Sequence, residues 1–130
     1  MNKHKNFSPL TLAFLGDSVF ELLVREKIVS GGDMPVSKLH SAAVKYVCSD
    51  AQAKAFRTIE LFLTAEELDI FRRGRNANGS TVPKNSTPAK YRTATGLEAV
   101  FGYLKLEGKN ERIAEIFEMI WKNGDNNNFD

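Results

Sequence analysis

The stretch LTLAFLGDSVFELLVREKIV, residues 10–29, decides the fold of this chain. It follows Ser8 and Pro9, a pair that opens helices with serine as the cap and proline at the first helical position, and a pair of glycines ends it. Apolar residues occur nearly all round this segment, which predicts a central helix. Asp17 interrupts the apolar pattern, and its presence needs a physical reason.

The rest of the chain repeats the helical pattern, and no segment shows the alternation typical of a strand. Thr64 and Glu67 form a capping box at the start of one helix, and Asn110 is the predicted cap of the last helix. The expected helices cover residues 10–29, 36–56 (two helices or one bent helix), 65–74, 91–108 and 110–124. The sequence therefore predicts an all-α helical bundle in which one loop is long.

Length and composition favour a single domain. The chain has 130 residues, of which 42% are hydrophobic, enough for one packed core. We expect one domain over residues 1–130, with its core at about 10–121 and a polar tail at 122–130. A single cysteine, Cys48, excludes an internal disulfide and favours a reducing compartment, and no apolar stretch approaches the roughly 20 residues of a membrane helix. These features predict a soluble, cytoplasmic protein without a membrane contact.

The charges are unevenly distributed along the chain. The net charge is only +2, yet the segment from Ile70 to Leu97 contains no acidic residue, and the rest of the chain carries 12 basic and 16 acidic side chains. Residues 76–90, NANGSTVPKNSTPAK, combine glycine, proline and small polar residues and are predicted to form a long loop. A loop of this length is uncommon in a helical bundle and is therefore a candidate for function.

Two apolar helices each carry an acid beside small residues, which are expected to leave room next to the carboxylate. Asp17 shares a helix face with Ala13 and Glu21, and Glu98 shares one with Thr95 and Gly102. Burial of a lone carboxylate is costly unless a cation, a partner or protonation compensates, and Mg²⁺ binds through one or two carboxylates.

An ordinary ion pair, or a position that faces solvent, is the alternative explanation for each acid. For Glu21 we favour such a pair, with Arg25 at i,i+4. For Glu98 the sequence alone favours neither a metal site nor the ordinary alternative, and for Asp17 it favours a metal site.

These residues carry a resemblance to a known family. LAFLGDSVFELLVRE (12–26) resembles the signature helix of the ribonuclease III family, and TGLEAVFGYLKLEG (95–108) resembles its second acidic motif. The segment that runs from FRRGRN through VPKN to the second motif resembles the short bacterial branch, Mini-ribonuclease III, which lacks the appended double-stranded-RNA-binding domain. The resemblance extends from about residue 10 to about residue 121.

The resemblance implies a metal-dependent endoribonuclease. It implies an all-helical homodimer with Phe14 at the dimer contact, and Mg²⁺-dependent hydrolysis of double-stranded RNA, in maturation of large-subunit (23S) ribosomal RNA. Asp17 and Glu98 match the family's catalytic, metal-binding acids, and Glu21 is an additional candidate ligand. A ribosomal protein is a further candidate partner.

Larger family members carry additional acids at positions that here hold other residues. These positions are Leu10, Ala13 and Thr95, so the number of metal ions per site stays open. Because these additional acids are absent, a noncatalytic RNA-binding or ribosome-associated module of the same fold is the alternative function. A nucleotide pyrophosphohydrolase would need a denser set of acids than the sequence provides.

The basic segment is the expected RNA contact. A protein without a separate RNA-binding domain must span the grooves of the duplex with its own loops, and basic residues there can neutralise phosphates. A solvated loop with scattered charge is the alternative, but the lack of acids over the whole segment favours RNA. The predicted RNA-binding residues are Arg72, Arg73, Arg75, Asn76, Lys84, Asn85, Lys90 and Arg92.

Overall fold

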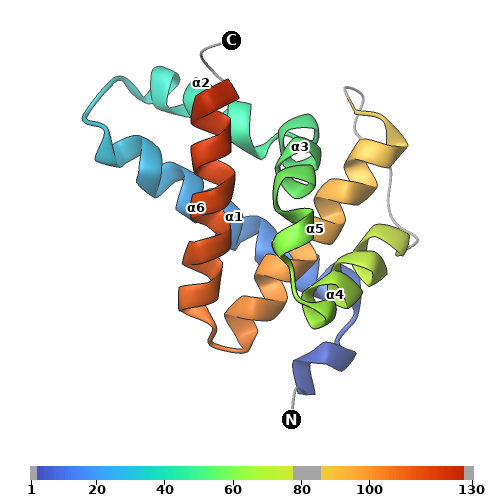
Figure 1. Cartoon of the computed structure of the whole chain (residues 1–130). Coiled ribbons are helices and arrows are strands. Elements are labelled where there is room, and N and C mark those ends of the chain that lie inside the picture. The colour runs from blue at the N-terminus through green and yellow to red at the C-terminus, as the bar shows by residue number, and fades with distance from the viewer. Residues whose placement is uncertain (1–2, 78–85, 128–130) are drawn as a thin grey trace.

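A computed structural model describes residues 3–77 and 86–127 of the chain (Figure 1). In these two ranges every regular element is helical, which confirms the all-α prediction. The elements in chain order are the short 3-10 helix η1 (Lys3–Asn6), α1 (Pro9–Ser30), α2 (Val36–Val47), α3 (Ser49–Ile59), the 3-10 helix η2 (Glu60–Phe62), α4 (Ala65–Asn76), α5 (Pro88–Leu106) and α6 (Asn110–Asn127). None of these helices is long and apolar enough to cross a bilayer.

Helix α5 is the centre of the fold. It packs against α1, α3, α4 and α6, as its position among these helices in Figure 1 shows. Its residues from Leu97 to Leu104 are buried except for Glu98, because apolar and small side chains cover its whole circumference there. Burial of this segment contributes apolar stabilisation at the centre of the core.

Helix α1 is only partly central, which corrects the sequence prediction. Leu12, Phe20 and Val24 point into the core, whereas several large apolar side chains on its outer face are exposed. These exposed residues are Leu10, Phe14, Leu22 and Val29. The apolar character all round α1 therefore reflects two apolar faces, one against α5 and one open to solvent.

Two glycines let α1 and α5 cross with their backbones in contact. A Cβ at Gly16 would lie 1.6 Å from the carbonyl oxygen of Glu98, and a Cβ at Gly102 would lie 1.9 Å from the carbonyl oxygen of Leu12. The sequence suggested that Gly102 leaves free space beside Glu98. The structure fills this space with the backbone of α1.

Several helix ends differ from the sequence prediction. Helix α4 continues past Gly74 to Asn76, because Gly74 is packed against α5, so closely that a Cβ at this position would lie 3.0 Å from the Cα of Gly96. The predicted loop is shorter at its second end, since Thr87 caps α5 through the amide of Lys90.

The structure also decides between one and two helices at residues 36–56, and it corrects both ends of the last helix. Residues 36–56 form two helices, with Cys48 between them in extended conformation. Helix α6 begins at Asn110 itself, whose side chain accepts a hydrogen bond from Lys105 Nζ (3.3 Å) and so is not the predicted cap. The same helix continues to Asn127, through most of the predicted tail.

Candidate active site

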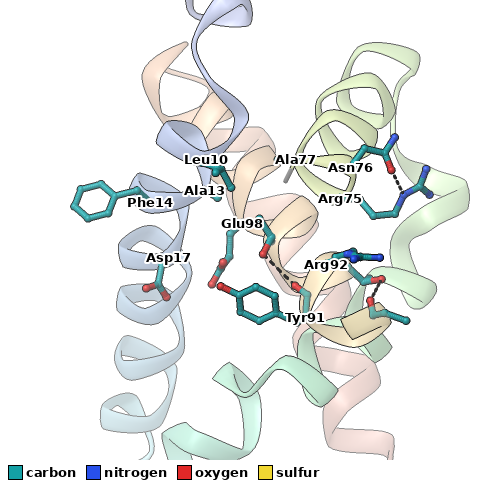
Figure 2. Close-up of a pocket in the computed structure, with 14 residues that line it drawn as sticks. Leu10, Ala13, Phe14, Asp17, Arg75, Asn76, Ala77, Tyr91, Arg92 and Glu98 are labelled. Atoms are coloured by element: carbon teal, nitrogen blue, oxygen red, sulfur yellow. Dashed lines mark hydrogen bonds between the residues drawn. The ribbon is translucent and has the colours of Figure 1, made fainter. Parts of the chain in front are cut away.

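A pocket of about 810 Å³ opens between α1, α4 and α5. Asp17 from α1 and Glu98 from α5 both line it, and Figure 2 shows the two carboxylates reaching toward the same space. Ala13 and Thr95, the small residues predicted to leave room beside these acids, line the pocket as well. The tertiary structure thus unites two acids that are 81 positions apart in the sequence.

The Gly16–Gly102 crossing explains why the two acids meet. Gly16 directly precedes Asp17, and its Cα faces the carbonyl oxygen of Glu98 itself. The closest approach of the two helices therefore lies one residue from Asp17 on α1 and at Glu98 itself on α5. A crossing at the usual interaxial distance of 8–10 Å would separate the carboxylates.

The two acids have different surroundings. Asp17 is exposed, although the apolar sequence around it suggested a buried position, because it projects from α1 into the open pocket. Glu98 is half-buried. Burial, and then the negative charge of Asp17, raise the pKa of Glu98 from 4.5 to about 8. Glu98 is therefore predominantly protonated at neutral pH when no cation is present.

Gln52 is a contributor that the sequence analysis missed. This side chain lies in the first turn of α3, and its Nε2 donates to Glu98 Oε2 at 3.4 Å and to the carbonyl oxygen of Val47 at 3.1 Å. The hydrogen bond to Glu98 lowers the pKa of that acid, against the larger effect of burial. A glutamine on an otherwise apolar and alanine-rich helix face was the sequence signal that could have revealed the role of Gln52.

The carboxylate oxygens of Asp17 and Glu98 are suitable ligands for a hard divalent cation. Two carboxylates repel each other in a pocket open to water, and a cation between them would relieve both the repulsion and the desolvation of Glu98. The described residues contain no group of three or more acidic, histidine or cysteine side chains that could together hold a metal ion. A cation here would therefore retain much of its hydration shell, as Mg²⁺ commonly does.

Glu21 does not belong to the pocket. Its Oε2 accepts a hydrogen bond from Arg25 Nε at 3.0 Å, one helical turn along α1. This is the ion pair that the sequence analysis favoured, and it leaves Asp17 and Glu98 as the two candidate ligands.

The predicted RNA-binding residues divide into groups. Arg75, Asn76 and Arg92 line the same pocket as the two acids, with Arg75 and Asn76 on the α4 side in Figure 2. Arg72 is exposed on α4 and does not line the pocket. Lys84 and Asn85 lie outside the described residues.

Arg75 Nε donates to Asn76 Oδ1 at 3.2 Å within the pocket, whereas two other predicted RNA-binding residues bind parts of the protein outside it. Arg73 donates to the carbonyl oxygens of Lys5 and Phe7 and so fastens the N-terminal segment to α4. Lys90 pairs with Asp50 at 2.8 Å, which joins the start of α5 to α3. The guanidinium groups of Arg75 and Arg92 are therefore the predicted cations that face the pocket.

Comparison with known proteins places this architecture in a family. A model of the ribonuclease III domain matches residues 10–109. The chain is 48% identical to Mini-ribonuclease 3 of Thermoanaerobacter sp. over 88% of its own length and 80% of that protein, and 46% identical to Mini-ribonuclease 3 of Symbiobacterium thermophilum over 85% of each. The chain belongs to the Mini-ribonuclease 3 family.

A solved structure agrees with this assignment. The crystal structure of a protein from Fusobacterium nucleatum superposes with a TM-score of 0.83 at 32% identity, over 90% of this chain and 95% of that one. Membership of the Mini-ribonuclease 3 family makes the chain an endoribonuclease. It also confirms the resemblance found in the signature helix and the second acidic motif.

Proposed function

We propose that this endoribonuclease cleaves double-stranded RNA with Mg²⁺ held by Asp17 and Glu98. The observation that carries the proposal is the convergence of these two acids, from separate helices, in one pocket that is open to solvent. Membership of a divalent-metal-dependent nuclease family supports the cation.

Each acid has its own task in this proposal. Asp17 is exposed and can contact a cation as it enters from solvent, whereas Glu98 is held deeper and must lose its proton to become a ligand. When bound, a divalent cation supplies an activated water for attack on phosphorus and positive charge for the phosphate oxygens. We assign proton transfer to neither acid.

The same pocket supports an RNA contact. Arg75, Asn76 and Arg92 surround the acids with donors that suit phosphate oxygens and 2′-hydroxyl groups. Arg75 also lies over the ring of Phe71, 5.6 Å from its centroid, which holds the guanidinium at the mouth of the pocket. Lys84 and Asn85 belong to the connection that follows Asn76 and are proposed to extend this contact.

We propose a homodimer that uses the outer face of α1. Phe14 is 83% exposed and points away from the other labelled side chains in Figure 2. Leu10 and Leu22 are exposed on the same side of α1, four residues before and eight residues after Phe14. A row of exposed apolar side chains of this kind marks a protein interface.

The proposed biological role is maturation of large-subunit (23S) ribosomal RNA in the cytoplasm, with a ribosomal protein as a candidate helper. The resemblance to the short branch of the family supports the substrate, and the single cysteine supports the compartment. One domain over residues 1–130 is sufficient in this proposal, because the pocket residues themselves contact RNA.

A cleavage assay tests the proposal. The natural protein, Asp17→Asn and Glu98→Gln are incubated with duplex RNA and Mg²⁺, and binding is followed in parallel by gel shift. We expect only the natural protein to cut, because each variant keeps the shape of the side chain and loses a ligand charge. Glu21→Gln, one turn further along α1, is the matched control and should cut normally. Unchanged cleavage by Asp17→Asn or Glu98→Gln would remove that residue from the site.

A further inference from the structure

Gln52 is the one side chain among the described residues with a buried polar atom that lacks a hydrogen-bond partner. The residue is 2% exposed, and its Nε2 is used by Val47 and Glu98, whereas its Oε1 contacts no donor. Loss of hydration without a replacement hydrogen bond destabilises the folded state at such a group. An unpartnered amide oxygen in this position therefore needs an explanation.

Glu67, the other buried polar or charged side chain in the described part of the chain, has all of its hydrogen-bonding needs met by the fold. Glu67 receives two hydrogen bonds from Arg112, at 2.8 and 2.9 Å, and caps the amide of Thr64 at 2.9 Å. The unpartnered oxygen of Gln52 is thus a local feature of the region around Glu98 and does not reflect poor packing of the core.

Gln52 lines a second cavity that also reaches Glu98. This cavity has a volume of about 320 Å³ and lies between α3 and α5, with Gln52, Ser49, Thr95 and Glu98 in its wall. Thr95 and Glu98 also line the larger pocket that contains Asp17. The amide of Gln52 therefore approaches Glu98 from the side of α3, while Asp17 approaches it from α1.

We propose that Gln52 is a positioning residue for the cation: its Nε2 holds the Glu98 carboxylate, and its free Oε1 accepts a hydrogen bond from the hydration shell of a divalent cation bound there. This inference rests on the proposed function. It gives the site a neutral oxygen in addition to its two acids, which suits a cation that keeps much of its water. Outer contacts of this kind typically contribute 10- to 100-fold in metal affinity.

Metal uptake without RNA is the direct test, because it is independent of cleavage. Mg²⁺ affinity is measured by calorimetry for the natural protein, for Gln52→Met, which keeps the length of the side chain and removes both polar atoms, and for Ser49→Ala. Ser49 lines the same cavity, but its hydroxyl bonds to Ser86 at 2.6 Å and not to Glu98. We expect Gln52→Met to bind Mg²⁺ at least tenfold more weakly, with an unchanged melting temperature without metal, and Ser49→Ala to bind normally.

A second variant tests whether the amide oxygen of Gln52 itself supports metal binding, or whether the side chain only contributes to packing. Gln52→Glu keeps an oxygen at this position but loses the Nε2 donor to Glu98, so at pH 9 we expect it to bind Mg²⁺ more weakly than the natural protein and more tightly than Gln52→Met. Affinities of Gln52→Met within twofold of the natural protein would overturn the inference, and so would an equal loss in Gln52→Met and Gln52→Glu. If the natural protein binds Mg²⁺ but leaves duplex RNA intact, the proposed function fails, while the measured affinities still decide the role of Gln52.

Discussion

At the scale of single residues, the two acids of the pocket are unequal. Asp17 is exposed, whereas Glu98 is half-buried beside it, and burial together with the charge of Asp17 raises the pKa of Glu98 to about 8. The folded protein without metal therefore binds a proton at Glu98 more tightly than the unfolded chain does. Ionisation of Glu98 opposes folding, and the proposed cation would compensate for it.

This difference predicts a pH-dependent stability of the metal-free protein. Because the folded pKa lies above the ordinary value of 4.5, stability should fall as the pH rises from that value through about 8. Glu98→Gln cannot ionise, so in EDTA at pH 9 it should be more stable than the natural protein by on the order of 2 kcal/mol. Urea unfolding at pH 5 and pH 9 measures the effect. A Glu98→Gln protein that loses stability with pH as steeply as the natural one would contradict it.

At the scale of the elements, the fold depends on close helix crossings at α5. The crossing of α1 and α5 uses Gly16 and Gly102, and that of α4 and α5 uses Gly74 and Gly96. These glycines bring the pocket-lining residues of α1, α4 and α5 to one side of the molecule. An ion pair, Arg112 with Glu67, then ties α6 to the start of α4.

Gly16→Ala should be severely disruptive. Its Cβ would lie 1.6 Å from the Glu98 carbonyl oxygen, so α1 and α5 must separate, and we expect a loss of at least about 3 kcal/mol in unfolding free energy. Thermal unfolding followed by circular dichroism measures this loss. Gly31→Ala is the control: Gly31 has a φ of −80°, and its Cβ would approach only the Ile28 carbonyl oxygen, at 3.3 Å. Equal stabilities of the two variants would argue against backbone contact at the crossing.

Arg112→Met should also be costly, for an electrostatic reason. Burial alone would raise the pKa of Glu67, but hydrogen bonds from Arg112 and Thr64 bring it below 4.5. Removal of Arg112 leaves this carboxylate buried without its partner, a loss of about 3 kcal/mol in unfolding free energy at pH 7. The loss should shrink below pH 4.5, where the pair no longer contributes fully.

Arg25→Met provides the comparison for this pair, because it removes an exposed ion pair with Glu21 and should change stability by less than about 0.5 kcal/mol. Chemical unfolding of both variants and the natural protein at pH 7 and pH 4 gives the change in unfolding free energy for each variant at each pH. Equal effects of Arg112→Met and Arg25→Met would show that burial of Glu67 is energetically unimportant.

At the scale of the whole molecule, the protein presents two contrasting surfaces. One is the pocket, where Arg75 and Arg92 surround two acids, and the other is the apolar outer face of α1, whose Leu10 and Phe14 also line the pocket. Both surfaces begin on α1, because Phe14 and Asp17 are less than one helical turn apart. The proposed dimer would therefore place its interface directly beside the catalytic pocket.

Phe14→Asp should weaken the dimer at least tenfold, because it places a charge where apolar area is proposed to be buried. Sedimentation velocity over a range of protein concentrations measures the change in dissociation constant. Leu61→Asp is the matched control, since Leu61 is also highly exposed but lies on η2, which packs against α3. Should Phe14→Asp dimerise like the natural protein, the outer face of α1 is not the interface.

The sequence by itself determined the helices, their order and the identity of the two acids. Helical periodicity and capping signals are local, so the capping box of Thr64 and Glu67 could be found without coordinates. The ion pair of Glu21 with Arg25 could also be predicted from the sequence, because the two residues are one helical turn apart. The tertiary structure decided everything that depends on contacts distant in sequence. Gly102 packs against α1, Asp17 is exposed, Arg73 binds the N-terminal segment, and Gln52 reaches Glu98 from α3. The reason is physical: burial and pKa depend on the neighbours that a fold assembles, and the periodicity of one helix does not specify those neighbours.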